Sequence, residues 1–369
     1  MILHLLFEDK FGEYAIEQFS GEEMCSEFVV VAFKKRGPFA ITSDKVKIIQ
    51  NSSTEFKELL CHLGRYKAIV LHGLFQHWQE TVLRAVPPEV KVAWVFWGGD
   101  IYGRSELSPK YQALSSKILV WFQRLSQVLS HRESKPSYEI PFPLLRRIDF
   151  CLTDIHEDFV FVKKYLQSDI RELWYNYYSI EETLGDLADA TITGQDVLIG
   201  NSSSIECNHV HGFRLIHRLN LGDSKVVVPL SYGDQWLKRV ILPIGRFLFG
   251  KRFMPILEFI PRGEYNQILQ NCSAVVMPHY RPQAFGNILT ALWLGSRVYL
   301  SERNVLYDYF KRIGAIVFTI EHDLKRYNPQ VLTPLSEHER LKNRLAIRAF
   351  YRKEVMHNKN LELVSVLNQ

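Results

Sequence analysis

The sequence lacks any apolar run of the length that a membrane-spanning helix requires. Its longest apolar runs, residues 117–122 and 240–249, are short or interrupted by Lys, Arg, Pro and Gly, whereas a span needs about 20 predominantly apolar residues. The apolar start of the chain has neither the basic stretch nor the small-residue cleavage site of a secretory signal. We therefore expect no transmembrane helix, and we interpret residues 2–7 as a first β-strand.

The chain also has few cysteines and no closely spaced pair of them. Five cysteines stand at wide spacings without a CxxC pair, which argues against a disulfide framework and a structural zinc site. A reducing cytoplasm is the simplest location for such a chain. The five are Cys25, Cys61, Cys151, Cys207 and Cys272.

A strong excess of one charge is absent as well. Lys and Arg together exceed Asp and Glu by five residues. This excess favours anionic ligands or an anionic membrane surface, but it is too small to indicate a nucleic-acid partner. Neither a GxGxxG nor a Walker pattern occurs, so any nucleotide site must be built from other loops.

What is present is the composition of a large globular protein. Hydrophobic residues make up 47% of the 369 positions and charged residues 23%, which allows a sizeable core. The length indicates two domains at about 150 residues each. Short β-rich runs alternate with helical patterns, so we predict an α/β fold with two Rossmann-like, doubly wound parallel sheets. The expected strands are residues 2–7, 28–33, 46–49, 68–71 and 92–96, then 197–199, 225–229, 254–259, 274–277, 298–301 and 316–319.

The domain boundaries follow from where strands are scarce. Residues 146–173 are expected to be poor in strands, and the best new strand-to-loop-to-helix start follows residue 196. We place an acceptor-binding domain at residues 1–180 and a nucleotide-sugar-binding domain at 181–340. A C-terminal segment of one or two helices, residues 341–369, is free to cap either domain.

The strongest local signal is Val-Leu-Ile-Gly-Asn-Ser-Ser-Ser at residues 197–204, an apolar strand that runs into small and polar residues. Small residues let the backbone approach a ligand closely, and the N–H groups at a helix N-terminus attract phosphate. A pyrophosphate would fit beside Gly200, Asn201, Ser202 and Ser203. Because an ordinary helix N-cap uses the same residue types, the motif alone leaves that alternative open.

Three more strand ends in this half carry polar residues. Tyr232 is placed to pack near a base or phosphate, or else to cover the edge of the core. Arg281 has the fork geometry that suits a phosphate, and Gln283 and Asn287 can bind sugar hydroxyls. Glu302 can accept hydrogen bonds from a sugar or complement a helix dipole. In open α/β sheets, ligands bind outside the carboxyl ends of the strands.

In the first half, two strands end in glycine-containing turns that bear a polar residue. Asp100 follows Trp97-Gly-Gly and can act as a general base, or it can serve as a turn or N-cap residue. His72 can orient a substrate. His209 and His211 have no partner carboxylate or Cys at a recognised ligand spacing, so we expect no metal site.

Five short motifs in a fixed order carry a resemblance to a known enzyme family. They are Trp97-Gly-Gly-Asp-Ile-Tyr, Gly200-Asn-Ser with Asn208-His209, Val228-Pro-Leu-Ser-Tyr, Gln283-Ala-Phe-Gly-Asn and Ser301-Glu-Arg-Asn. In order and approximate spacing they resemble the TDP-N-acetylfucosamine:lipid II N-acetylfucosaminyltransferases, glycosyltransferase family 56. The resemblance implies a GT-B architecture with the active site in the cleft between the domains. It also implies transfer of 4-acetamido-4,6-dideoxygalactose (N-acetylfucosamine) from a TDP donor to a polyprenyl-pyrophosphate-linked saccharide in bacterial surface-polysaccharide synthesis.

The same resemblance distributes the roles. Arg281 would neutralise the departing diphosphate and Asp100 would act as the base, without a metal or another cofactor. The acceptor-binding residues would be His72, Trp97, Gly98 and Gly99. The donor-binding residues would be Gly200, Asn201, Ser202, Ser203, Tyr232, Gln283, Phe285, Gly286, Asn287 and Glu302.

Two alternatives to this function stay open. A glycosyltransferase with the same fold can use a UDP- or GDP-linked sugar in place of a TDP-linked one. A non-catalytic scaffold can bind a nucleotide sugar through the same loops and turn nothing over. Sequence alone does not separate a scaffold from an enzyme.

A lipid-linked acceptor would bring the protein to the inner face of the cytoplasmic membrane. Residues 110–135 and 236–253 both mix basic and bulky apolar residues, as an interfacial helix does. Either segment can instead be a core-packed helix with solvated basic positions. We expect a cytoplasmic protein that associates peripherally with the inner membrane.

Overall fold

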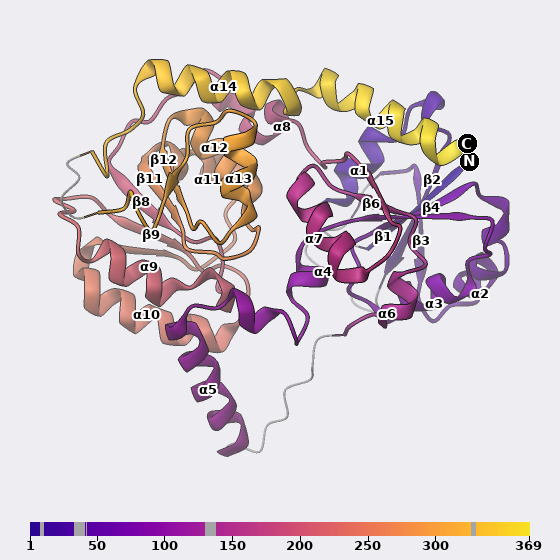
Figure 1. The fold of residues 1–369 in the computed structure, drawn as a ribbon, viewed down its shortest axis with the longest axis horizontal. Coiled ribbons are helices and arrows are strands. Elements are labelled where there is room, and N and C mark those ends of the chain that lie inside the picture. The colour runs from indigo at the N-terminus through magenta and orange to yellow at the C-terminus, as the bar shows by residue number, and fades with distance from the viewer. Residues whose placement is uncertain (8–10, 33–40, 42, 130–137, 326–329) are drawn as a thin grey trace. The chain divides into compact units, whose positions relative to one another are not determined.

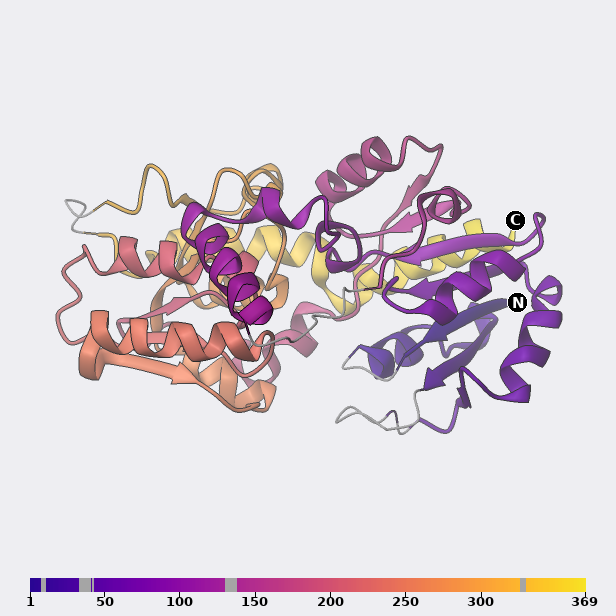
Figure 2. The same cartoon turned by 90° about the horizontal axis from the view of Figure 1, so that it is seen from below.

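The computed structural model covers residues 1–369 and describes all of them except 8–10, 33–40, 42, 130–137 and 326–329. The chain forms two compact units. Unit 1 comprises Met1–Arg104, Pro136–Ser179 and Lys353–Gln369, and unit 2 comprises Ser105–Lys135 and Ile180–Arg352. Each unit has one parallel sheet with helices packed around it (Figure 1, Figure 2). The predicted fold class, α/β with two doubly wound sheets, is confirmed.

The sheet of unit 1 has seven strands in the order β3-β2-β1-β4-β5-β6-β7, all paired in parallel. The expectation that residues 146–173 are poor in strands is wrong, because β6 and β7 lie there and extend the sheet. Phe33, at the end of the second expected strand, lies outside the described residues. The strands are β1 (Ile2–Leu6), β2 (Ser26–Ala32), β3 (Val46–Gln50), β4 (Ala68–His72), β5 (Lys91–Val95), β6 (Phe150–Leu152) and β7 (Arg171–Leu173).

Helices cover the sheet of unit 1. The hydroxyl of Ser53 accepts a hydrogen bond from Phe56 N–H at 3.2 Å and so caps the second of these helices. The last helix of the chain closes the unit, because Leu363, Val364 and Leu367 are buried in the same core as β1. The helices are α1 (Gly12–Gln18), α2 (Thr54–Cys61), α3 (His77–Ala85), α4 (Gly99–Tyr102), α6 (Phe142–Leu145), α7 (His156–Leu166) and α15 (Lys353–Asn368).

The sheet of unit 2 has six strands in the order β10-β9-β8-β11-β12-β13, again all parallel. Every residue of β9, β11 and β12 is buried, as expected for strands covered on both faces. The six strands expected in this half are all present. They are β8 (Asp196–Ile199), β9 (Val226–Pro229), β10 (Phe253–Ile256), β11 (Cys272–Met277), β12 (Arg297–Leu300) and β13 (Phe318–Thr319).

The helices of unit 2 come from two separate segments of the chain, since α5 lies in Ser105–Lys135 and the others in Ile180–Arg352. The C-terminal segment forms two helices that belong to different units: α14, capped by Ser336 and Glu339, packs in unit 2, whereas α15 packs in unit 1. In the described part of the chain, no helix is both long enough and apolar enough to cross a membrane. The helices are α5 (Leu114–Leu129), α8 (Ile180–Leu184), α9 (His209–Ile216), α10 (Gln235–Phe249), α11 (Arg262–Gln270), α12 (Phe285–Leu294), α13 (Val305–Arg312) and α14 (Glu337–Tyr351).

Residues 105–129, which precede the expected domain boundary by some 50 positions, pack with unit 2. Asn208 provides the physical reason. Its Oδ1 accepts hydrogen bonds from Ala113 N–H at 2.8 Å and from Ser116 Oγ at 2.9 Å. Its Nδ2 donates to the carbonyl of Pro278 at 2.9 Å. One buried amide thereby ties the start of α5 to two loops of unit 2.

Candidate active site

The carboxyl ends of β8, β9, β11 and β12 meet at one edge of the unit 2 sheet, because the strands are parallel. The loops that follow these strands are residues 200–208, 230–234, 278–284 and 301–304. We call these four loops, with the first turn of α12, the strand-end site. It contains all the predicted donor-binding residues together with Arg281.

Gly200 shapes the first loop of the strand-end site. Its φ is +70°, and a Cβ atom at this position would lie 2.8 Å from Cε1 of His209, so only glycine fits. His209 Nε2 donates a hydrogen bond to the Ser202 carbonyl at 2.7 Å. Burial lowers the pKa of His209 to about 4, so a neutral imidazole holds the loop in shape.

Three predicted residues come together from two loops. Asn201 Nδ2 donates to the hydroxyl of Tyr232 at 3.0 Å, and Ser203 Oγ donates to the Tyr232 carbonyl at 2.7 Å. The Tyr232 side chain nevertheless stays 53% exposed. Its ring is therefore fixed at one end and open to stacking along its face.

The loop after β11 carries polar atoms with unused hydrogen-bonding capacity. Arg281 Nε and Gln283 Nε2 are buried donors that have no hydrogen-bond partner among the described residues, and His209 Nδ1 at the start of α9 also has none. Such atoms are uncommon in folded proteins, since each costs about 1–3 kcal/mol when it stays unpaired. A bound molecule with oxygen acceptors would satisfy the two donors.

The backbone of this loop is held from the end of β12. Asn304 Nδ2 donates to the carbonyls of Arg281 and His279 at 2.9 and 3.2 Å. The guanidinium of Arg281 lies 3.8 Å from the carboxylate of Glu206, which is longer than a direct hydrogen bond. Its Nη1 donates to the Pro282 carbonyl at 3.3 Å, so the guanidinium is held by one long hydrogen bond while its Nε stays without a partner among the described residues.

Helix α12 begins at the end of the same loop. Ala284 has a φ of +60°, an uncommon conformation for a residue with a side chain. The first N–H groups of a helix, here those of Phe285, Gly286 and Asn287, have no intrahelical partner and attract anions. The ring of Phe285 stacks on Phe310 with centroids 5.7 Å apart. Phe285 therefore packs its side chain into unit 2 and leaves only its backbone for a ligand.

Two carboxylates, not one, lie beyond β12 and β13. Glu302 is partly exposed, and its Oε2 lies 3.2 Å from His322 Nε2. Glu321 accepts hydrogen bonds from Ser301 Oγ at 2.5 Å and from Glu302 N–H at 3.1 Å. Sequence reasoning missed Glu321, although it stands two residues after a predicted strand, where a carboxyl-end loop begins.

In unit 1, Asp100 lies in the first turn of the four-residue helix α4. Its Oδ2 accepts a hydrogen bond from Trp94 Nε1 at 2.8 Å and a long one from Trp97 N–H at 3.4 Å. Gly98 has a φ of +76° and Gly99 begins the helix. Asp100 therefore braces the predicted turn.

His72 and Trp97 belong to a buried chain of hydrogen bonds in unit 1. Trp97 Nε1 donates to Tyr177 Oη at 2.8 Å, and that hydroxyl lies 2.9 Å from His72 Nδ1. His72 Nε2 then lies 3.1 Å from Nδ1 of His4, which contacts Ser26 through its other nitrogen. Every hydrogen bond in this row has one donor and one acceptor when both imidazoles are neutral and each carries its proton on Nε2. Tyr177, its central member, was not predicted from sequence.

Burial lowers the pKa of His4 to about 3 and that of His72 well below its ordinary value. The unfolded chain binds protons on these histidines below a pKa of about 6.5, whereas the folded chain does not. The free energy of unfolding should therefore fall as the pH falls below that value, by up to about 1.4 kcal/mol per pH unit for each histidine. Urea unfolding of His72→Asn between pH 7.5 and 5 should show a flatter pH dependence than the native chain.

The exposed His357 on α15 supplies the control for that measurement. His357→Asn should leave the pH dependence unchanged, because this exposed side chain takes no part in the buried hydrogen bonds of His4 and His72. If the free energy of unfolding depended on pH equally in the native protein and in His72→Asn, the claim that the buried histidines are neutral would be contradicted.

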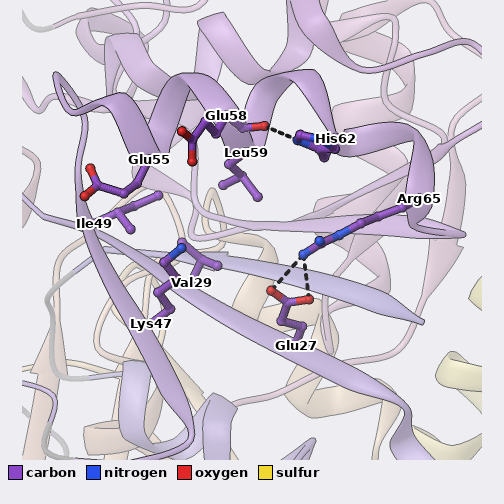
Figure 3. Close-up of a pocket in the computed structure, with 9 residues that line it drawn as sticks. All are labelled: Glu27, Val29, Lys47, Ile49, Glu55, Glu58, Leu59, His62 and Arg65. Atoms are coloured by element: carbon purple, nitrogen blue, oxygen red, sulfur yellow. Dashed lines mark hydrogen bonds and ion pairs between the residues drawn. The ribbon is translucent and has the colours of Figure 1, made fainter.

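A separate hollow of about 250 Å³ lies on unit 1 between α2 and strands β2 and β3 (Figure 3). The guanidinium of Arg65 bridges the carboxylate of Glu27 at 3.1 and 3.2 Å, and His62 Nδ1 binds the Glu58 carbonyl at 2.7 Å. Glu27 stands near the start of β2, at the amino ends of the strands. The hollow runs from there along β2 and β3 to Ile49 and to Glu55 in the first turn of α2.

Comparison with known proteins bears on the fold. No family model matches the chain. Sucrose-phosphate synthase from Thermosynechococcus elongatus is 12% identical, with a TM-score of 0.62 over 100% of this chain and 99% of that one. The α,α-trehalose 6-phosphate synthase from Burkholderia multivorans is 11% identical, with a TM-score of 0.61 over 100% and 99%. An α-glucosyltransferase solved with UDP and a DNA 13-mer is 11% identical, with a TM-score of 0.58 over 99% of each chain.

This chain has the GT-B fold. The full-length coverage extends the likeness to both units, which confirms the predicted architecture of two Rossmann-like domains. An Anabaena protein solved with UDP and glucose is also similar, at 10% identity and a TM-score of 0.55 over 100% of this chain and 97% of that one. Among the residues that the structure describes, no three His, Cys, Asp or Glu side chains are grouped so that they could hold a metal ion.

Proposed function

We propose that the protein is a glycosyltransferase whose unit 2 binds a nucleotide-diphosphate sugar at the strand-end site. The observation that carries the proposal is the pair of unpartnered buried donors on Arg281 and Gln283. A diphosphate offers oxygens to both donors, and the tight turn at Gly200 lets it approach the backbone. The GT-B fold supports the proposal, because two of the similar proteins were solved with UDP.

In the proposed reaction, a hydroxyl of the acceptor attacks the anomeric carbon of the donor sugar. The bond from that carbon to the diphosphate breaks, and the hydroxyl proton passes to a general base. Arg281 and the N-terminus of α12 stabilise the negative charge of the departing diphosphate. Because these groups supply positive potential where the charge develops, we propose that turnover needs no divalent metal.

Asp100 is the proposed base, and its replacement by asparagine separates that role from bracing the turn. The amide oxygen of Asp100→Asn can still accept the hydrogen bond from Trp94, but an amide cannot take a proton. Turnover should fall by about 10²- to 10⁴-fold while nucleotide affinity stays constant, which kinetics and calorimetry measure. Asp149→Asn, at the amino edge of the same sheet, is the control. If Asp100→Asn turned over at the native rate, Asp100 would not be the base and its role would be structural.

The resemblance of the sequence motifs to glycosyltransferase family 56 supports a finer proposal for the substrates. We propose TDP-N-acetylfucosamine as donor and a polyprenyl-pyrophosphate-linked saccharide as acceptor, with the enzyme at the cytoplasmic face of the inner membrane. A UDP-linked sugar is the second candidate donor, because similar proteins were solved with UDP. Unit 2 would bind the donor, and the Trp97-Gly-Gly turn of unit 1 would bind the acceptor.

A transfer assay tests the proposal. The purified chain is incubated with a polyprenyl-pyrophosphate-linked disaccharide and with TDP-N-acetylfucosamine, UDP-N-acetylglucosamine or UDP-glucose, and the product is identified by mass spectrometry. We expect a product from the TDP donor that forms equally with and without EDTA. A product from a UDP donor alone would support the glycosyltransferase activity and show that the donor is a UDP-linked sugar. Nucleotide binding without any transfer would indicate a non-catalytic scaffold.

A further inference from the structure

Helix α5 turns Ser116, Gln123 and the partly buried Leu119 toward unit 2, and it leaves a broad apolar side exposed, which an ordinary surface helix does not. Ser116, buried at 2% exposure, binds Asn208, and Gln123 Nε2 binds Asp234 at 2.8 Å. Figure 1 shows the later turns of α5 extending away from α10 within unit 2. The inner side of the helix is thus fastened by hydrogen bonds.

The outer side is a continuous stripe of large apolar residues. At 100° per residue these positions span about 120° of the helix surface. Exposed fractions are 60% for Trp121 and 51% for Phe122, whose rings contact each other at 5.0 Å between centroids. The apolar stripe consists of Leu114, Ile118, Trp121, Phe122, Leu125, Val128 and Leu129, all of them exposed.

The residues beside the apolar stripe are basic, which indicates a negatively charged binding surface. Lys117 and Arg124 border it on one side, and α5 contains no Asp or Glu. A 16-residue helix is too short to span a bilayer, which takes about 20 residues, but it suits the boundary between headgroups and acyl chains. Basic residues along such a helix favour anionic lipids.

We infer that α5 docks unit 2 on an anionic lipid bilayer by inserting the apolar stripe, with Lys117 and Arg124 on the lipid headgroups. The inference deepens the proposed membrane location of the enzyme. The other segment with membrane-like composition does not compete: α10 buries Leu237, Ile241 and Phe249 in the core of unit 2. Residues 130–135 of the predicted segment 110–135 lie outside the described residues.

Co-sedimentation of the full chain with vesicles tests the docking surface. We expect the native chain to bind phosphatidylcholine–phosphatidylglycerol vesicles at least about tenfold more tightly than pure phosphatidylcholine. The double variant Trp121→Ser/Phe122→Ser should lose binding to the mixed vesicles by at least about tenfold. Lys117→Glu/Arg124→Glu should abolish the preference for anionic lipid. Phe247→Ser removes a ring that is 89% exposed on α10 and should bind as the native chain does.

Three outcomes would overturn the inference. The native chain would fail to bind either vesicle, or the Trp121/Phe122 variant would bind as well as the native chain. In the third, light scattering would show that the native chain is a dimer and that the Trp121/Phe122 variant is a monomer. The apolar stripe would then be the contact surface for a second copy. Melting temperature and nucleotide affinity, measured on the same variants, should match the native chain. Lost vesicle binding with intact nucleotide binding would remove only this inference and leave the proposed transferase in place.

Discussion

Replacing Arg281 by alanine is expected to lower kcat/KM by about 10²- to 10³-fold, the usual effect of removing one group that stabilises developing charge. The buried Nε of Arg281 has no hydrogen-bond partner among the described residues, and the nearest carboxylate oxygen lies 3.8 Å from Nη2. Because Nη1 alone is occupied, by the Pro282 carbonyl at 3.3 Å, the other donors are available to an incoming diphosphate. Part of the loss should appear in binding, because the diphosphate is charged in the ground state as well. Steady-state kinetics and calorimetry on one preparation separate the two parts.

Two further variants accompany Arg281→Ala: Arg281→Lys as the conservative replacement and Arg252→Ala as the control. Lysine keeps the charge but not the fork geometry, so it should recover part of the lost activity. Arg252 is an exposed residue that donates to the Gly222 carbonyl, just before β10, and its replacement should leave turnover unchanged. If Arg281→Ala turned over at the native rate, the diphosphate role of this residue would be refuted.

Replacing Asn208 by alanine is expected to reduce the free energy of unfolding of unit 2 by about 3 kcal/mol, because several buried hydrogen bonds are lost together. Asn208 is fully buried and binds Ala113, Ser116, Pro278 and the Tyr111 carbonyl through one side chain. Its φ of 50° suits asparagine better than alanine, which adds to the cost. Urea unfolding measures the total.

The same change should release the start of α5 before the rest of unit 2 unfolds. Hydrogen exchange should rise in residues 111–119 of Asn208→Ala at a denaturant concentration where the sheet stays protected. Asn220→Ala, in an exposed turn where the side chain accepts a long hydrogen bond from Gly222 N–H at 3.4 Å, is the control. Unchanged exchange in α5 would show that Asn208 does not fasten this helix.

Much of the fold follows from sequence because parallel strands buried on both faces are nearly continuous apolar runs. β1, β8, β9, β11 and β12 have this character and were all predicted. β6 and β7 have three residues each, and β7 reads Arg-Glu-Leu, too short and too polar to show an apolar run. Their place in the sheet depends on pairing with β5, which is a tertiary property.

The gathering of the site residues at one sheet edge was predictable where they lie in a loop after a predicted strand. The Gly200 turn, Arg281 and Glu302 lie in the loops that follow predicted strands, and parallel pairing brings such loops to one edge. The grouping of residues 105–129 with unit 2 rests on the amide of Asn208, some 90 positions away in sequence. Tyr177 stands 105 positions from His72, and no local pattern predicts such pairings.

The central claim is that the strand-end site binds a nucleotide diphosphate, and calorimetric titration with TDP, UDP, GDP and ADP tests it most directly. A ligand at a hundredfold excess over its Kd stabilises the native state by about 2.7 kcal/mol, so thermal unfolding gives an independent readout. We predict binding that prefers TDP, persists in EDTA, and weakens at least about tenfold in Arg281→Ala. The account would be contradicted if none of the four nucleotides bound, or if the native chain and Arg281→Ala bound TDP equally well.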